Sequence, residues 1–294
     1  MRGKIIKGIA GFYYVWSENK IYECKARGKF RKNGLTPMVG DRVELSLDKD
    51  SEASDPSMLP GTVDRILPRI NEFDRPPIAN VQTTVIVAAA KDPEPLTYVI
   101  DRMAVGAELK NTEILICLNK TDLESSEEIC RIYQGIYPVY PVSAKSGAGL
   151  ENLKGALQGK QAALSGPSGV GKSSLTKALL GDSAEKVQVG EISAKTLRGK
   201  NTTRHSELFA GDGFFLFDTP GFTSFETPEL DENELDQYFP EFENFRGKCR
   251  FDNCRHLSEP ECAVKDALTE GRIKKSRYES YKTMYKECKE RRRF

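Results

Sequence analysis

The sequence predicts a chain of several domains: a small OB-like β-barrel at the N-terminus, a central α/β domain, and a mostly helical C-terminal domain. Short strand-like segments separated by turn residues fill the first part of the chain, which predicts the barrel. Strands and helices then alternate, which predicts a parallel sheet covered on both faces. With 294 residues there is room for more than one core, and we place the domains at 1–68, 69–225 and 226–294.

The barrel should contain five short strands. We place them at residues 8–16, 21–25, 29–31, 41–47 and 61–67. The polar, proline-containing stretch 50–60 is expected to form a loop within the barrel, and residues 68–77 are expected to link it to the next domain.

Aromatic side chains in the barrel alternate with cations, a pattern typical of surfaces that stack RNA bases beside phosphate-binding charges. The aromatic residues are Phe12, Tyr13, Tyr14, Trp16, Tyr22 and Phe30, and the cations are Lys20, Lys25, Arg27, Lys29, Arg31 and Lys32. Alternatively, the rings fill the barrel core and the cations are simply solvated. We favour an RNA-binding barrel, while single residues more often follow the alternative.

The central domain should alternate strands and helices from Val81 onward. We expect strands at 81–90, 113–118, 137–142, 161–165 and 213–217, and helices at 95–109, 125–133, 150–157 and 172–180. Functional residues of such sheets lie in the loops that follow the strands.

One of these loops fits the phosphate-binding pattern G-x-x-x-x-G-K-[ST]. It consists of Gly166, Pro167, Ser168, Gly169, Val170, Gly171, Lys172 and Ser173. In this pattern backbone amides enclose the phosphates, the lysine reaches the β and γ oxygens, and the hydroxyl binds magnesium. We also assign the flanking Ser165 and Ser174 to nucleotide binding, and Lys172 is the first catalytic candidate.

A second loop, Asn119-Lys120-Thr121-Asp122, predicts which base is bound. The Asp122 carboxylate can accept two hydrogen bonds from guanine, whereas adenine would leave it unpaired. A capped turn is the alternative for this loop. Ser143-Ala144-Lys145 follows another strand and is typical of the loop that supports guanine, although alone it can be an ordinary turn. Together the loops predict GTP, and a P-loop kinase would have no use for the base loop.

The magnesium site should be completed by residues after the phosphate loop. Asp218 and Gly221 follow the apolar run 213–217, which places Asp218 where a carboxylate reaches a magnesium-bound water. Thr202 and Thr203 lie between this run and the phosphate loop, where a switch threonine would contact the ion, and we favour Thr203. Magnesium would therefore be held by Ser173, Thr203 and Asp218.

The order of these motifs is unusual, because the base loop precedes the phosphate loop. Ordinary small GTPases begin with the phosphate loop, so the order predicts a circularly permuted GTPase domain. Permutation is tolerated because the site depends on where loops lie in space and not on their succession along the chain. Nucleotide state would then be transmitted to both flanking domains.

Three cysteines and one of the chain's two histidines gather in the C-terminal domain as C-x4-C-x-H-x5-C. Cys249, Cys254, His256 and Cys262 supply a complete tetrahedral shell, which predicts one structural zinc ion. The alternative is a loop with scattered thiols and a surface histidine. The other cysteines have no partners at ligand spacing, and an odd total of seven argues against a secreted disulfide framework.

Composition excludes some classes of protein. The formal net charge is +1, so binding to nucleic acid must rely on local patches. No run of eighteen apolar residues suggests a transmembrane helix, and the basic N-terminus lacks the features of a signal peptide. We expect a cytoplasmic protein without membrane contacts. The charged tail that ends in Arg291, Arg292 and Arg293 is typical of a solvated helix, or it contacts RNA phosphates.

The combination of a barrel, permuted motifs and the cysteine-histidine spacing resembles the RsgA family of circularly permuted GTPases over essentially the whole chain. The stretches 36–41 (TPMVGD) and 199–205 (GKNTTRH) also look like signatures of this family. The resemblance implies a GTPase, expected to be monomeric, that binds the small ribosomal subunit and its rRNA. It further implies action late in subunit maturation and departure after GTP is hydrolysed to GDP.

The chain departs from the family where water would be positioned. Asn201 stands where the family commonly has histidine, and Phe222 stands where many GTPases carry a glutamine. The candidates for positioning the water are Asn201, His205, a backbone carbonyl and a group of the ribosomal partner. The side chains of Asn201 and His205 can equally face solvent. We expect slow intrinsic turnover that the subunit accelerates. Two other functions stay open: an RNA-binding assembly factor that uses GTP as an occupancy switch, and a GTP-dependent regulator of a non-ribosomal protein.

Overall fold

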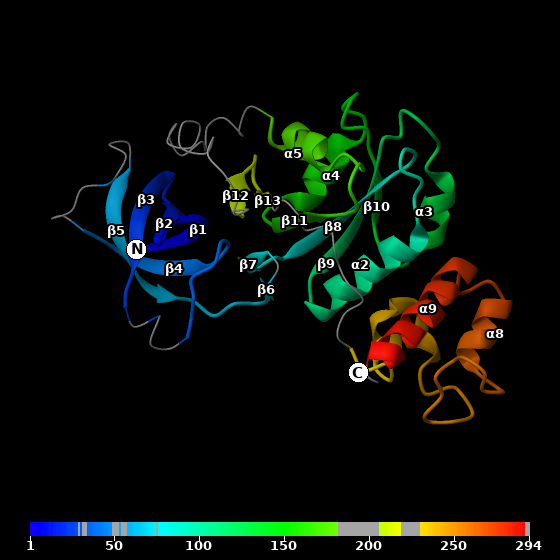
Figure 1. The fold of residues 1–294 in the computed structure, drawn as a ribbon. Helices are drawn as coiled ribbons and strands as arrows, with labels where there is room; N and C mark the ends of the chain where they lie inside the picture. The colour runs from blue at the N-terminus through cyan, green and yellow to red at the C-terminus, as the bar shows by residue number, and fades with distance from the viewer. Residues whose placement is uncertain are drawn as a thin grey trace. The chain divides into compact units, whose positions relative to one another are not determined.

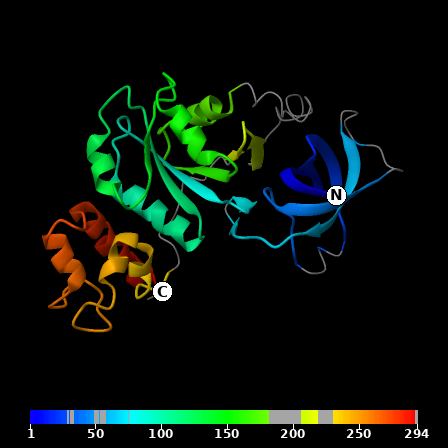
Figure 2. The ribbon, with the colours of Figure 1, turned by 180° about the vertical axis from the view of Figure 1, so that it is seen from behind.

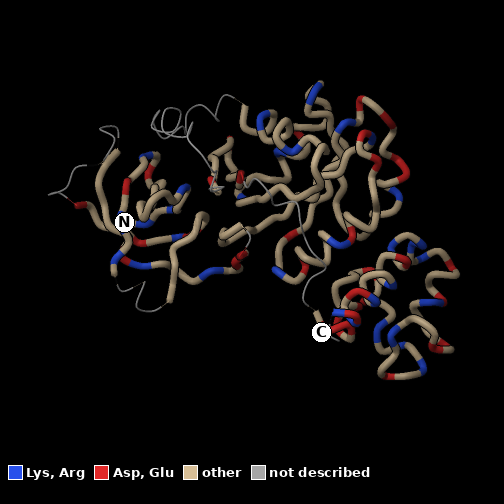
Figure 3. Tube along the Cα trace, viewed as in Figure 1, with Lys and Arg blue, Asp and Glu red and all other residues tan. Residues whose placement is uncertain are grey.

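The computed structural model describes residues 1–28, 30, 34–48, 53, 58–74, 76–181, 206–218 and 230–291. The chain forms two compact units that interleave along the sequence (Figures 1 and 2). The first comprises Met1–Thr84, Leu150–Leu164 and Ser173–Phe222, and the second comprises Val85–Gly149, Ser165–Lys172 and Thr223–Phe294. Basic and acidic residues intermingle along the described chain (Figure 3), and in the full sequence their numbers nearly balance, at 44 and 43.

A β-barrel begins the first unit. Its strands are β1 (Arg2–Ile9), β2 (Phe12–Ser17), β3 (Lys20–Ala26), β4 (Arg42–Leu47) and β5 (Leu59–Ile66). They follow the order β1-β2-β3-β5-β4, and β4 also pairs with β1, which closes the barrel. Alternate residues of these strands fill the core, which includes Ile5, Val15, Tyr22, Cys24, Phe30, Val43, Leu45 and Val63.

The structure corrects several predicted strand boundaries. The predicted strand 8–16 is two strands joined at Ala10 and Gly11, which both have positive φ, and the first begins already at Arg2. Phe30 is helical and buried, so the predicted strand 29–31 is wrong there, while Lys29 and Arg31 lie outside the described residues. The predicted loop 50–60 ends earlier, because β5 begins at Leu59.

The burial of the barrel aromatics is mixed. Tyr22 and Phe30 belong to the core, so the alternative, in which the rings fill the barrel, holds for these two residues. Phe12, Tyr13 and Tyr14 are half-buried, and Tyr13 packs against the barrel core. Trp16 instead packs edge-on against Phe215 of the α/β part, with ring centroids 5.3 Å apart. Lys32 lies outside the described residues.

The predicted linker 68–77 is more ordered than expected. It contains β6 (Glu72–Asp74), which pairs with β7 (Pro77–Ala79). The Arg69 guanidinium donates to both carboxylate oxygens of buried Asp41, each at 2.8 Å. This bidentate pair fixes the chain as it leaves the barrel.

The α/β strands of the first unit continue directly from the barrel. They are β11 (Gln161–Ser165), β12 (Glu207–Ala210) and β13 (Phe215–Asp218), in the order β11-β13-β12-β1. The sequence did not predict β12, which pairs with β1 where Lys7 faces Glu207, and their side chains form a 3.2 Å ion pair. The helices α4 (Leu150–Leu157) and α5 (Lys172–Leu180) match the prediction.

The TPMVGD stretch has a structural role at this junction. Gly40 has φ +94°, and a Cβ there would lie 2.1 Å from the Ala79 carbonyl oxygen, so only glycine fits. The Gln161 side chain at the start of β11 donates to the carbonyl oxygens of Ala79 at 3.0 Å and Gly40 at 3.3 Å. Buried hydrogen bonds therefore join the barrel, the β6–β7 pair and the α/β strand β11.

The second unit contains the other α/β strands. These are β8 (Thr83–Ala89), which the chain enters from the first unit, β9 (Glu113–Asn119) and β10 (Val139–Pro141), in the order β10-β9-β8. The helices α2 (Thr97–Leu109) and α3 (Glu127–Tyr133) cover them, with a core built around Ile86, Met103, Ile116 and Tyr133. The alternation predicted from the sequence is correct here.

The C-terminal part of this unit is mostly helical, as predicted. It consists of the 3₁₀ helices η1 (Leu235–Tyr238) and η2 (Pro240–Phe245) and the α-helices α8 (Ala263–Thr269) and α9 (Lys275–Arg291). The charged helix α9 is not solvated all round, because Tyr281, Met284 and Tyr285 join a core that also includes Val105 of α2. Residues 292–294 lie outside the described part.

Helix α9 is joined to α2 by a buried charge. The Arg277 side chain is fully buried and donates to Asp101 of α2 at 2.7 Å and to both oxygens of Glu241 at 2.7 and 2.9 Å. Burial alone would lower the pKa of Arg277, but these two carboxylates raise it well above its usual value. The contact fixes the C-terminal helices on the α/β part of the same unit.

Candidate nucleotide site and metal centre

Three predicted nucleotide loops meet at one side chain, Asn119, at the end of β9. Its Nδ2 donates to the Val170 carbonyl oxygen in the phosphate loop at 2.9 Å, and its Oδ1 accepts from the Ala144 backbone N–H at 3.0 Å. The side chain is 2% exposed. A single carboxamide therefore joins the base loop, the supporting loop and the phosphate loop before any nucleotide binds.

Asp122, the predicted guanine-selecting residue, lies at the surface. Its side chain is exposed, and the Ser143 hydroxyl donates to Oδ1 at 2.6 Å. This hydrogen bond lowers the pKa of the Asp122 carboxyl, with a smaller contribution from Lys145. Asp122 therefore stays ionised, which is the form that accepts the two N–H donors of guanine. Ser143 is held in turn by its N–H, which donates to the Ala148 carbonyl oxygen at 2.9 Å.

Lys120 brings in a loop that the sequence analysis did not assign to the site. The residue has φ +63°, and its ammonium donates to the backbone carbonyl oxygen of Asp92. The neighbouring Pro93 approaches the phosphate loop, since a Cβ on Gly169 would lie 3.6 Å from its Cδ. Polar residues directly after the buried strand β8 were the available signal, because such positions line the ligand edge of a parallel sheet.

The phosphate loop is shaped by two close backbone approaches. A Cβ on Gly166 would lie 2.2 Å from the Val87 carbonyl oxygen, and one on Gly171 would lie 2.4 Å from Asn119 Nδ2. Gly171 also has φ +92°, so both positions are restricted to glycine. The glycines of the motif thus let the loop pack against the two strands that carry the rest of the site.

Lys172 lies where the loop turns into α5. Its ammonium donates to the carbonyl oxygens of Gly166 at 2.6 Å and Pro167 at 2.8 Å, and burial lowers its pKa. Ser173 and Ser174 are exposed in the first turn of α5. A helix N-terminus preceded by a glycine-rich loop favours phosphate through its free amides and its dipole.

Asp218 ends β13 at the edge where β11 also ends. The two strands run parallel with Ala163 opposite Phe217, and β11 continues at Ser165 into the phosphate loop. Asp218 is exposed, yet the surrounding protein removes enough water to raise its pKa. The remaining predicted residues of this site, Asn201, Thr203, His205 and Gly221, lie outside the described residues.

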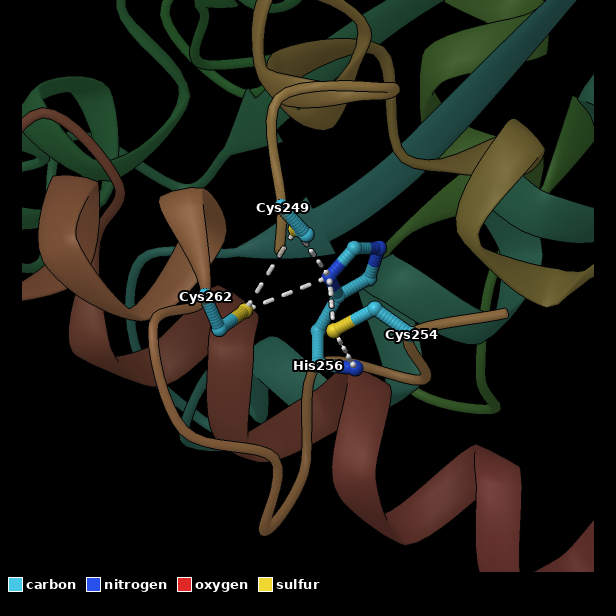
Figure 4. A group of neighbouring side chains, drawn as sticks. All are labelled: Cys249, Cys254, His256 and Cys262. Atoms are coloured by element: carbon cyan, nitrogen blue, oxygen red, sulfur yellow. Dashed lines mark hydrogen bonds between the residues drawn. The ribbon is translucent and has the colours of Figure 1, made fainter. Parts of the chain in front are cut away.

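The four predicted metal ligands converge in the C-terminal part (Figure 4). The ligand atoms of Cys249, Cys254, His256 and Cys262 all lie within 4.8 Å of one another. His256 Nδ1 is 3.6, 3.5 and 3.3 Å from the sulfurs of Cys249, Cys254 and Cys262, and the first and last sulfurs are 3.9 Å apart. A tetrahedral zinc ion requires separations of about 3.8 Å between sulfurs and about 3.5 Å between sulfur and nitrogen. The residues fit such an ion.

The surroundings of the cluster hold the ligands in place. Asp236 Oδ2 lies 3.9 Å from His256 Nε2, the ring nitrogen that does not face the sulfurs, and a carboxylate there orients a metal-bound imidazole. Tyr278 of α9 donates to the His256 carbonyl oxygen at 2.6 Å. Burial raises the pKa of the Cys254 thiol to about 12, and the adjacent thiols add to the rise. A bound cation would reverse this preference, because metals bind thiolates and displace their protons.

Comparison with known proteins agrees with this geometry. The sequence profile of the RsgA GTPase family matches residues 66–228, and that of the RsgA N-terminal domain matches residues 2–54. The chain belongs to the RsgA GTPase family. It is therefore a GTP hydrolase, in which the Cys249–Cys262 cluster can hold a metal and magnesium accompanies GTP.

Relatives and solved structures cover nearly the whole chain. Proteins described as small ribosomal subunit biogenesis GTPase RsgA from Alkaliphilus metalliredigens and Agathobacter rectalis are 44% and 41% identical, with 99 to 100% of each chain covered. The crystal structure of YjeQ from Thermotoga maritima has 36% identity and a TM-score of 0.81 over 98% of both chains. YloQ, described as a circularly permuted GTPase, matches at 35% identity, also with a TM-score of 0.81, over 99% of this chain and 95% of its own. The circularly permuted fold predicted from motif order is thus confirmed.

Among the described residues, no helix combines the length and apolar character needed to cross a bilayer.

Two contributions to the sites, those of Asp92 and Asp236, were not predicted from the sequence. Asp92 acts through its backbone carbonyl, so the polar residues after β8 indicate the loop but not this particular contact. Asp236 lies 20 residues before His256 and approaches it only through the fold of η1.

Proposed function

We propose that this GTPase binds the small ribosomal subunit and its rRNA, and that it acts in late subunit maturation. Subunit contact would accelerate hydrolysis of GTP to GDP and phosphate. The names of its relatives, which are small-subunit biogenesis GTPases over their full length, support the partner. The protein would work in the cytoplasm as a monomer, with the domains 1–68, 69–225 and 226–294 acting as RNA-binding barrel, GTPase and zinc-binding module.

The observation that carries the GTP assignment is the junction at Asn119. Its two hydrogen bonds keep the base loop and phosphate loop together, so a guanine nucleotide meets both ends of its site preassembled. Asp122 would select guanine, Lys120 would pack beside the base, and Ser143 to Lys145 would support it. Lys172 would neutralise charge on the β- and γ-phosphates.

The metal assignments rest on donor chemistry. Ser173, Thr203 and Asp218 offer oxygen ligands, which magnesium prefers, and the ion would offset developing phosphate charge. The three thiols and the imidazole suit zinc in a closed, structural shell. Asn201 and His205 remain candidates for positioning the attacking water.

The test is GTP turnover measured with and without purified small ribosomal subunits. We expect slow turnover alone and an acceleration of about 10³-fold or more on the subunit, because phosphoryl transfer depends chiefly on positioning and charge stabilisation. Lys172→Ala should abolish turnover in both conditions. Binding to subunits without acceleration would instead favour the occupancy switch, and no binding at low salt would favour a non-ribosomal partner.

The base assignment has its own test in a competition between GTP and xanthosine triphosphate. Asp122→Asn should shift preference toward xanthine, because the new amide complements the xanthine carbonyl and no longer accepts both guanine donors. An unchanged preference for GTP would contradict the role given to Asp122.

A further inference from the structure

His256 has an unusual backbone conformation. Its φ is +60°, in the left-handed region that residues other than glycine seldom adopt. In this conformation Nδ1 faces the three sulfurs of the cysteine cluster, at distances of 3.3 to 3.6 Å (Figure 4). A side chain whose backbone lies in a sparsely populated region needs surrounding groups that favour that conformation.

The Glu259 carboxylate bridges the two residues on either side of His256. Its Oε1 accepts from the Arg255 backbone N–H and its Oε2 accepts from the Leu257 backbone N–H, each at 2.8 Å. Between them, the His256 N–H donates to Cys254 Sγ at 3.4 Å. Successive N–H groups that converge on acceptors in this way are typical of turns that contain one left-handed residue. Glu259 therefore provides two of the acceptors that favour the turn.

Other contacts hold the carboxylate and the turn in place. Lys265 of α8 donates to the Glu259 carbonyl oxygen at 2.9 Å, and Tyr281 of α9 donates to the Arg255 carbonyl oxygen at 2.9 Å. Burial alone would raise the pKa of the Glu259 carboxyl, but the backbone N–H groups that donate to it lower its pKa below the ordinary value. Hydrogen bonds to an ionised carboxylate are stronger than those to a neutral acceptor.

We propose that Glu259 is a positioning residue of the metal centre, and that its carboxylate holds His256 in the left-handed conformation that directs Nδ1 toward the three sulfurs. The proposal rests on the zinc assignment in the proposed function, because the imidazole serves as the fourth ligand of a closed shell. Without the carboxylate, the N–H groups of Arg255 and Leu257 lose their acceptors. A right-handed His256 would turn its ring away from the sulfurs and leave only three thiols as ligands.

Glu261 provides a matched control within the same loop. It also has a positive φ, +50°, and directly precedes Cys262, but its side chain is exposed and pairs with the exposed Arg250. An exposed ion pair contributes little to stability. Glu261→Gln therefore makes the same chemical change as Glu259→Gln beside the same cluster, without disturbing the turn at His256.

The test uses the full chain, with Co²⁺ as a spectroscopic probe of the ligands and a chelator that competes for zinc. Wild type should show the visible bands of a tetrahedral cobalt site with three thiolates and one imidazole. In Glu259→Ala these bands should move toward those of His256→Ala. Zinc affinity should fall by about 10–100-fold, as is typical when a residue that orients a ligand is removed.

Two conservative variants complete the test. Glu259→Gln keeps the size of the side chain and one accepting oxygen, so its zinc affinity should lie between those of Glu259→Ala and wild type. Glu261→Gln should match wild type in affinity and spectrum. If Glu259→Ala does not fold, the comparison of the two glutamine variants decides the question, and equal zinc affinity in them would overturn the proposal.

The cobalt spectrum separates positioning of the ligand from general stability of the loop. If Glu259→Ala bound zinc more weakly but kept the wild-type cobalt bands, His256 would still be a ligand and the proposal would be wrong. If wild type bound zinc no better than Cys262→Ser, the zinc assignment would fail, and this proposal with it. If wild type bound zinc tightly and every glutamate variant matched it, only the role of Glu259 would fail.

Discussion

The predicted nucleotide loops and the cysteine cluster both belong to the second unit, but they are held together differently. Asn119, Ser143 and Lys120 join the nucleotide loops through hydrogen bonds within the chain. In the cluster, the ligand atoms of the four residues instead lie within 4.8 Å of one another. Hydrogen bonds within the chain hold the nucleotide loops together, whereas in the cluster the proposed zinc ion would compensate three crowded sulfurs.

The difference has an energetic reason. A nucleotide binds and leaves in each cycle, so its site must persist without it, and strand ends with shared hydrogen bonds provide this. A structural metal stays bound, so its binding free energy can serve folding directly. The C-terminal helices are small, and their core depends on the loops that carry the ligands.

Metal removal should therefore have the largest effect. In Cys262→Ser, or after chelation, the segment 249–291 should lose protection from hydrogen exchange, because zinc contributes on the order of 10 kcal/mol to the folding of such modules. GTP affinity should fall far less, since the nucleotide loops keep their own hydrogen bonds. Cys130→Ser in α3 is the matched control. If Cys262→Ser kept its protection from hydrogen exchange, the cluster would be held together by contacts within the chain, as the nucleotide loops are.

Arg277→Ala should have the next largest effect, and it tests whether the C-terminal module and α2 are energetically joined. Removing the guanidinium leaves Asp101 and Glu241 buried without their partner, which should cost about 3–5 kcal/mol of unfolding free energy. Urea denaturation measures this loss. A triple variant, Arg277→Met with Asp101→Asn and Glu241→Gln, should regain much of it. A loss below about 1 kcal/mol in the single variant would mean that the buried pair is compensated elsewhere.

Local pattern and motif spacing predicted most of the α/β core and the convergence of the four Cys and His residues, while the nucleotide and magnesium ligands stay predictions. Strands such as β9 and loops such as 166–173 carry their signal within a few residues. Arg277 and Asp101 are 176 positions apart, and nothing near either residue indicates that they meet. The strand β12 was missed because four residues carry too little pattern, and it is defined by pairing with β1 and β13. Tyr22 and Phe30 show that tertiary burial, which local pattern cannot reveal, decides whether an aromatic ring is available.

Asn119→Ala sharpens the comparison from the nucleotide side. The variant loses the hydrogen bonds to Val170 and Ala144, so its loops should become less ordered without nucleotide. GTP affinity should fall by about 5–150-fold, corresponding to about 1–3 kcal/mol for two buried hydrogen bonds. Calorimetric titration with a non-hydrolysable analogue measures this, while metal content should stay unchanged. Full affinity in the variant would show that the loops are preorganised by their strands alone.

Lys4→Met should have the smallest effect, and it extends the question of preorganisation to β13, which carries Asp218 in the first unit. The Lys4 ammonium lies 3.7 Å from the Phe215 ring centroid, and burial, with a smaller contribution from Arg42, lowers its pKa to about 8. Between this value and the ordinary 10.5, the unfolded chain binds more protons than the folded one, so unfolding free energy should rise with pH across that range.

Lys4→Met should remove this rise and stabilise the protein at pH 7 by about 1 kcal/mol, a value reduced for partial solvent access and for the lost contact with the ring. Lys4→Arg keeps its charge throughout, so it should also lack the rise but remain less stable than the methionine variant. Urea denaturation at intervals between pH 7 and pH 10.5 supplies the comparison. If unfolding free energy has the same dependence on pH in wild type and both variants, the ammonium beside Phe215 is well hydrated. In that case β13 is held by its strand pairing with β11 and β12 alone.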